Sequence, residues 1–236
     1  MLTPVEPKTL DHIALWVTER ERIVEFVTAH LGMHVIDRTD TFTLVGANAR
    51  RSKLTLFDAE GPRQRGALRH IAFRVNDLER AVAELPRDWP REAEHEGVYF
   101  DLYEGIRLGL VGAETESDYD FDHVALFSAR PEETARAYES FGFRPAARTA
   151  SGAPRVEVAG AFVEFWHGEA DAGDRPLLNH LALLVDSADR HVQEANERGI
   201  EVQDVVDATN TFAAFLWGPE RVRIEYVEHK PTFALK

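Results

Sequence analysis

The sequence predicts an α+β protein built from four copies of one βαβββ module. Three observations lead to this fold class. A short segment with a histidine recurs four times along the 236 residues, a helix signal follows each copy, and short strand-like runs follow each helix. Self-similarity at a nearly constant spacing indicates repeated supersecondary units.

The recurring segment predicts the first strand of each module, because small and apolar residues run through it. The histidines of successive copies lie 58, 53 and 57 residues apart, which gives each module fewer than 60 residues. The four copies are Asp11–Leu15, Arg69–Phe73, Asp122–Leu126 and Asn179–Leu183, and their histidines are His12, His70, His123 and His180.

A helix is expected directly after each of these strands. Thr18 with Glu21 three positions later forms a capping-box pattern, and Asn76 and Ser187 are further N-cap candidates. Pro131 suits the first turn of the third helix. The expected helix ends lie near His30, Glu84, Gly142 and Gly199.

Strand-like runs after each helix complete the modules. The acidic stretch Glu114–Asp120 separates the second module from the third, so we expect two domains, residues 1–116 and residues 119–236, with two modules each. The runs are Phe42–Val45 with Lys53–Phe57, Val98–Tyr103 with Ile106–Val111, Arg155–Val158 with Ala161–Trp166, and Thr211–Trp217 with Val222–Val227.

Composition narrows the classes of function. The chain has no cysteine, which excludes disulfides, cysteine-ligated metal sites and a thiol nucleophile. The formal net charge of −14 repels phosphate backbones, so no nucleic-acid partner is expected. No apolar run reaches the length of a membrane span and no signal-peptide pattern is present, so we expect a cytoplasmic protein without a membrane partner. The oligomeric state stays open, with a homo-oligomer among the options.

With four such modules, the whole chain resembles the vicinal-oxygen-chelate superfamily. This group includes glyoxalase I, bleomycin resistance proteins and the extradiol ring-cleaving dioxygenases. The resemblance implies that two modules pair into a cupped mixed sheet with one divalent metal inside the cup. It also implies metal ligands on the first and last strands of the modules and a small-molecule substrate with two neighbouring oxygens.

In the second pair of modules the resemblance implies a complete metal site in the C-terminal domain. His123 and His180 stand at the first-strand positions, and Glu164 and Glu225 stand at the matching last-strand positions. Two imidazoles and two carboxylates suit one divalent ion such as Fe, Ni, Co, Mn or Zn. The expected substrate pocket beside this ion is lined by Phe127, Phe162, Trp166, Phe215 and Arg223.

The first pair of modules resembles a degenerate copy of this site. His12 and His70 are present, but Thr55 and Gly109 stand where the resemblance places carboxylates. Two histidines without a carboxylate form a poor site for a divalent ion. We therefore expect the N-terminal domain to hold no metal and to serve as a scaffold.

Three functions stay open, two of them enzymatic. The favoured one is glyoxalase-like isomerase or lyase chemistry through a metal-bound enediolate, with Glu164 or Glu225 leaving the metal to act as the general base. The second is an Fe(II) extradiol dioxygenase of catechol-type aromatics, with His123, His180 and Glu225 as its triad; Phe215 stands where the resemblance places a tyrosine. The third is a metal-free drug-binding protein of the resistance type.

Overall fold

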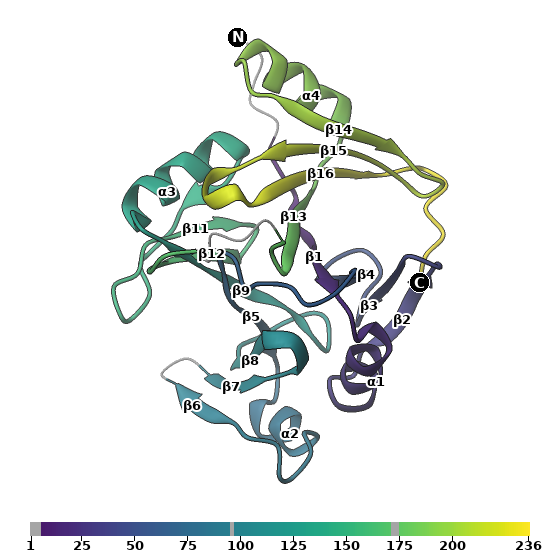
Figure 1. Cartoon of the computed structure of the whole chain (residues 1–236), viewed down its shortest axis with the longest axis vertical. Helices are drawn as coiled ribbons and strands as arrows, with labels where there is room; N and C mark the ends of the chain where they lie inside the picture. Colours follow the sequence, from purple (N-terminus) through teal and green to yellow (C-terminus); the bar gives the residue numbers. More distant parts are fainter. Residues whose placement is uncertain (1–5, 95–96, 171–174) are drawn as a thin grey trace.

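Four βαβββ modules form two mixed eight-stranded sheets, each made from two modules (Figure 1). The computed structural model describes residues 6–94, 97–170 and 175–236. The α+β fold class and the module order expected from the repeat are confirmed.

The elements of the modules follow one another in the same order. Module 1 contains β1 (Thr9–Val17), α1 (Arg20–His30), β2 (His34–Arg38), β3 (Phe42–Gly46) and β4 (Lys53–Asp58). Module 2 contains β5 (Leu68–Val75), α2 (Leu78–Ala83), β6 (Glu92–Glu94), β7 (Gly97–Asp101), the 3-10 turn η1 (Tyr103–Gly105) and β8 (Arg107–Gly112). Module 3 contains β9 (Asp120–Ser128), α3 (Pro131–Tyr138), η2 (Glu139–Phe141), β10 (Arg144–Pro145), β11 (Arg155–Val158) and β12 (Ala161–His167). Module 4 contains β13 (Leu178–Leu184), α4 (Ala188–Glu197), β14 (Val202–Asp207), β15 (Thr211–Trp217), η3 (Pro219–Arg221) and β16 (Arg223–His229).

Two of the predicted helix starts are confirmed and one shifts by a residue. α3 begins at Pro131, and the side chain of Ser187 caps α4. α2 is capped by Asp77, because the side chain of the expected residue, Asn76, instead exchanges hydrogen bonds with the backbone of Thr115.

The expected cap of α1, Thr18, is not its N-cap residue, which is Glu19, and a glutamate from another module binds the turn before the helix. Glu104 in η1 accepts hydrogen bonds from the backbone N–H of Thr18 at 2.9 Å, from that of the next residue at 2.7 Å, and from the Thr18 hydroxyl at 2.8 Å. Glu220 in η3 occupies the corresponding turn of module 4 and accepts hydrogen bonds from the hydroxyls of Ser128 and Thr134 in module 3. These two glutamates therefore link modules 1 to 2 and 3 to 4.

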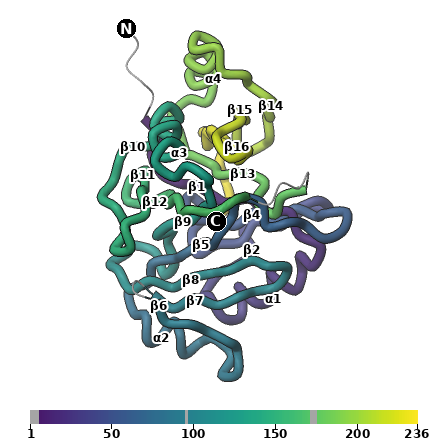
Figure 2. Tube along the Cα trace, turned by 60° about the vertical axis from the view of Figure 1, so that its left-hand side comes forward, coloured from purple at the N-terminus to yellow at the C-terminus, as the bar shows by residue number. Residues whose placement is uncertain are grey.

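The sheets, however, pair module 1 with module 4 and module 2 with module 3. β1 lies antiparallel to β13, and this pair is the centre of the sheet β14-β15-β16-β13-β1-β4-β3-β2 (Figures 1 and 2). β5 lies antiparallel to β9 at the centre of the other sheet, β10-β11-β12-β9-β5-β8-β7-β6. Each sheet thus combines modules from both halves of the chain.

This pairing corrects the expected division into residues 1–116 and residues 119–236. Modules adjacent in sequence usually pair, but all four first strands carry the same apolar pattern, which does not specify the partner. The acidic stretch is a connection within one sheet, from β8 on one side of β5 to β9 on its other side. Its last residue, Asp120, is buried in β9 and bonds to Arg51 and Ser52 of module 1.

Sequence-adjacent modules also contact each other through residues of their helical segments. Phe26 of α1 packs on Trp89 and Phe100 of module 2, with ring centroids 4.8 and 6.0 Å apart. Tyr226 of module 4 donates a hydrogen bond to the carbonyl of Phe141 in module 3. One buried apolar cluster contains residues of all four modules, and a second, small cluster in module 4 consists of Ala182, Ala213, Phe215 and Val227. Among the described helices, none has the length and apolar character that a membrane span requires.

Candidate metal centre

The strand register defines one equivalent position on the last strand of every module. The alanine two residues after each repeated histidine lies opposite this position on the parallel neighbour strand. Ala182 faces Glu225, Ala125 faces Glu164, Ala14 faces Thr55 and Ala72 faces Gly109. The correspondence read from the sequence is therefore the one that the sheets build, and each sheet receives two histidines and one glutamate.

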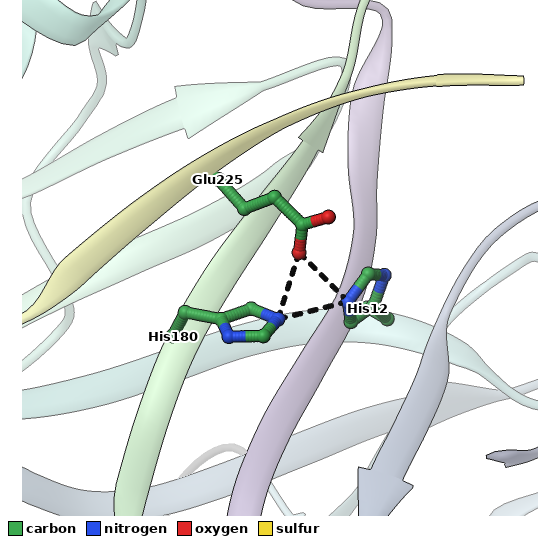
Figure 3. A group of neighbouring side chains, drawn as sticks. All are labelled: His12, His180 and Glu225. Atoms are coloured by element: carbon green, nitrogen blue, oxygen red, sulfur yellow. Dashed lines mark hydrogen bonds and ion pairs between the residues drawn. The ribbon is translucent and has the colours of Figure 1, made fainter. Parts of the chain in front are cut away.

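The sheet of modules 1 and 4 brings together His12 of β1, His180 of β13 and Glu225 of β16, which we call the first site (Figure 3). The two imidazole Nε2 atoms lie 3.0 Å apart. Oε2 of Glu225 lies 2.7 Å from Nε2 of His180 and 3.1 Å from Nε2 of His12. His180 and Glu225 are buried and His12 is half-buried, so the three atoms converge away from bulk water.

Hydrogen-bond acceptors behind both histidines fix which nitrogen of each ring points into the first site. Nδ1 of His12 donates to Asp11 at 2.8 Å, and Nδ1 of His180 donates to Oδ1 of Asn179 at 3.0 Å. Each Nε2 is then the nitrogen with the lone pair, as a metal ligand requires. A cation from the neighbouring strand holds each acceptor in turn: Lys53 binds Asp11 at 2.8 Å and Arg223 donates to Asn179 at 3.1 Å.

Three lone-pair atoms within 3.1 Å of one another repel unless a positive charge lies between them. In the metal-free chain a proton takes that place. Burial alone would lower the pKa of His12, but the charge of Glu225 and the hydrogen bonds to Asp11 and Glu225 raise it to about 9. Burial alone would raise the pKa of Glu225, whereas His12 and His180 hold it below its usual range. The donor set, its burial and its orientation fit a divalent metal.

The second site lies on the sheet of modules 2 and 3 and consists of His70, His123 and Glu164, all buried. The Nε2 atoms of His70 and His123 are 2.8 Å apart. Nδ1 of His123 donates to Asp122 at 2.7 Å, in the same way as Nδ1 of His12 donates to Asp11. By composition this is a copy of the first site.

Arg69 makes the second site chemically different. Its guanidinium lies 3.2 Å from Nδ1 of His70. Since arginine has only donors, Nδ1 of His70 must accept, and the ring proton lies on Nε2. That proton is donated to Nε2 of His123. Burial, His123 and Arg69 lower the pKa of His70 to about 2, so the ring stays neutral. His70 therefore offers a proton, and no lone pair, to the centre of the second site.

The fourth ligand position is closed in the second site. A Cβ atom on Gly109 would lie 2.4 Å from the ring of Tyr99, so only glycine allows that ring its place. The hydroxyl of Tyr99 lies 3.3 Å from Nε2 of His123. Glu164 accepts a hydrogen bond from Trp166 at 3.1 Å and pairs with Arg155 at 3.7 Å. The donors here are already bound to one another and to neighbouring side chains.

The four predicted metal ligands are consequently divided between two sites. His180 and Glu225 lie in the first site, whereas His123 and Glu164 lie in the second, because their modules belong to different sheets. The predicted substrate pocket divides in the same way. Phe215 and Arg223 belong to the sheet of the first site; Phe127, Phe162 and Trp166 belong to the sheet of the second.

His12 joins His180 in the first site, although the sequence placed His12 in a domain expected to be a scaffold. The repeat contains a signal that distinguishes the two sites. The residue before each repeated histidine is an acceptor in three copies, Asp11, Asp122 and Asn179, and a donor only at Arg69. That difference alone separates the two sites.

Comparison with known proteins agrees with this architecture. Residues 9–88 match the sequence model of the Glyoxalase/Bleomycin resistance protein/Dioxygenase superfamily. This match covers module 1 and the first two elements of module 2. No curated protein matches the sequence.

Solved structures with the same fold can be aligned with nearly the whole chain. A putative dioxygenase from Bacillus subtilis is 17% identical, with a TM-score of 0.76, over 96% of this chain and 87% of that one. A variant of glyoxalase I from Zea mays is 14% identical, with a TM-score of 0.75, over 93% and 92%. The cppA protein from Streptococcus pneumoniae is 15% identical, with a TM-score of 0.63, over 95% and 99%. At these identities the likeness establishes the fold, and the activity has to be argued from the sites.

Proposed function

We propose that the chain is an iron-dependent dioxygenase whose first site acts on a small aromatic substrate with two neighbouring oxygens, of the catechol type. The observation that carries this proposal is the donor set of the first site, with two histidines, one glutamate and no second carboxylate at the equivalent position, Thr55. Two histidines and one carboxylate with open positions are typical of non-haem Fe(II) oxygenases.

His12, His180 and Glu225 would hold the ion, and Asp11 and Asn179 would keep both imidazoles in the ligating tautomer. When bound, Fe(II) supplies open positions for O2 and for two vicinal oxygens. The protein orients the two imidazoles. Asp11 and Asn179 accept hydrogen bonds from them, and Lys53 and Arg223 hold these two acceptors in place.

The wall of the first site suits an aromatic ring. Phe215 lies 5.2 Å and Phe57 lies 6.3 Å from the ring of His180, measured between ring centroids. The guanidinium of Arg223 lies over Phe215 at 4.5 Å and places a positive charge beside this wall. An aromatic substrate with negatively charged oxygens would find both ring surface and a cation here.

Isomerisation through an enediolate has less support from the structure than from the sequence. That mechanism requires a second glutamate near the metal to move the proton. The strand pairing puts Glu164 in the other sheet, and the equivalent position of the first site holds the uncharged Thr55.

The experiment is anaerobic loading with Fe(II), followed by O2 consumption with catechol, in the wild type and in His180→Ala and His123→Ala. We expect one O2 per catechol consumed in the wild type and in His123→Ala, and none in His180→Ala. Deuterium incorporation from solvent into the methylglyoxal–glutathione adduct, without O2 consumption, would overturn the proposal in favour of isomerisation.

The variant Phe215→Tyr provides a second test of ring cleavage. Phe215 on β15 lies opposite Glu225, and Tyr99 on β7 lies opposite Gly109, the same position in the second sheet. Glu225 leaves less room than Gly109 does, but the ring of Phe215 already lies 5.2 Å from that of His180, so a hydroxyl added to it should lie beside the first site. A proton donor there should raise the rate of ring cleavage by roughly 100-fold. A lower rate would argue against ring cleavage.

A further inference from the structure

The second site contains a small cavity that the proposed dioxygenase does not use. Its volume is about 70 Å³. The cavity is lined by a guanidinium, an indole, hydroxyls and two carboxylates. These groups belong to Arg69, Tyr99, Trp166, Glu94, Glu164 and the loop Thr149–Ser151. Because His70 presents a proton to the centre of this site, its occupant has to be sought outside metal chemistry.

The carboxylates around the cavity are paired with cations other than Arg69. Glu94, at 3.1 Å, shares Arg107 with Glu92 and Asp101, and Glu164 pairs with Arg155 at 3.7 Å. Asp122 is bound to His123 and lies 3.6 Å from Arg74. Among the described residues, no carboxylate lies within ion-pair distance of Arg69.

Arg69 is held in place by contacts that leave most of its donors free. Its guanidinium stacks over Trp166 at 4.1 Å from the ring centroid, and one N–H group contacts His70. A guanidinium has five N–H donors in a rigid fork, which matches the two oxygens of a carboxylate. Because stacking fixes the fork before a ligand arrives, little side-chain entropy is lost on binding.

We propose that the second site is a metal-free binding site for a small monocarboxylate, with Arg69 as its anion partner. The donor fork of Arg69 favours a carboxylate, and the cavity volume limits the ligand to a few carbon atoms. Thr149 and Ser151, whose hydroxyls lie 3.0 Å apart at the cavity, would add polar contacts at the rim. The proposal is independent of the activity proposed for the first site.

The test is a titration of chelator-treated protein with propionate, followed through the indole N–H signal of Trp166 in a 1H–15N spectrum. Propionamide, a neutral molecule of the same shape, is the matched ligand control. We expect a saturable shift with propionate and none with propionamide. Arg69→Gln should weaken binding by about tenfold or more, because a charged hydrogen-bonded pair is lost. Arg69→Lys keeps the charge without the fork, so its affinity for propionate should lie between those of the wild type and Arg69→Gln.

Arg63→Gln is the matched protein control, since the guanidinium of Arg63 also lies over an indole, that of Trp16, but in another part of the chain. It should leave propionate binding unchanged. So should His180→Ala, which disables the first site, and this separates the two proposals. Equal binding of propionamide, no saturable shift, or undiminished binding in a folded Arg69→Gln protein would overturn the inference. A divalent ion that is lost in His123→Ala but not in His180→Ala would overturn it as well.

Discussion

The first and second sites have the same residue types on equivalent strands of the two sheets, but the protons on their histidines are arranged differently. In the first, Asp11 and Asn179 accept from the two Nδ1 atoms, so a metal has to displace only the proton held between the Nε2 atoms and Glu225. In the second, Arg69 donates to Nδ1 of His70 and places a proton at the centre. The comparison teaches that three ligating residue types in proximity do not define a metal site, because the groups behind them decide which atoms carry lone pairs.

The largest expected effect separates the two sites by removing one histidine from each. His180→Ala should lower the affinity of the protein for divalent metal by at least about 100-fold, since loss of an outer-shell partner alone costs 10–100-fold. The matched variant His123→Ala should retain the wild-type content of about one metal per chain. Elemental analysis after anaerobic purification gives both numbers. Metal loss in His123→Ala alone would reverse the assignment of the two sites.

The next prediction concerns a variant that should convert the second site into a copy of the first. Arg69→Asp supplies an acceptor for Nδ1 of His70, as Asp11 does for His12. We expect metal content to rise from about one to about two per chain, measured by equilibrium dialysis against Zn2+. Arg63→Asp, with the same charge change elsewhere, should stay at about one. If Arg69→Asp also stays at one, the tautomer argument is wrong.

Much of this comparison was already present in the sequence. The repeat predicted all four modules, and the family resemblance implied that positions 55, 109, 164 and 225 are equivalent, which the register confirms. These are local features of a module and depend only on residues within about 60 positions of one another.

The pairing of modules could not be predicted in the same way. β1 presents Ile13 to Leu181 of β13, but Ile71 and Val124 would offer an equivalent apolar surface. The choice depends on contacts between modules, such as the Glu104 bonds to the α1 turn and the Phe26 contacts with module 2. Those contacts place adjacent modules back to back, so each must find its sheet partner elsewhere in the chain.

A smaller effect concerns the acid side of the stability profile. The pKa of His70 is about 2 in the folded chain, because of burial and the nearby His123 and Arg69, against about 6.5 when unfolded. Below pH 6.5 the unfolded chain binds a proton that the folded chain does not, so this group destabilises the fold increasingly as pH falls. The contribution is about 1.4 kcal/mol per pH unit. His70→Gln should remove that slope between pH 6 and pH 5, measured by urea denaturation of metal-free protein. An unchanged slope would show that His70 is protonated in the fold.

The smallest effect compares the two glutamates that join sequence-adjacent modules. Glu104→Ala removes the acceptor of two backbone N–H groups in the turn before α1 and should cost about 1 kcal/mol of unfolding free energy, the net contribution of a typical hydrogen bond. Glu220→Ala should cost less, since Ser128 and Thr134 keep their own hydrogen bond at 2.8 Å. Glu104 has φ of 57°, so Glu104→Gly removes the same acceptor while relaxing the backbone and should be milder than Glu104→Ala. Urea midpoints of the three variants give the order. If Glu220→Ala were the most destabilising, the link between modules 3 and 4 would contribute more to stability than the link between modules 1 and 2.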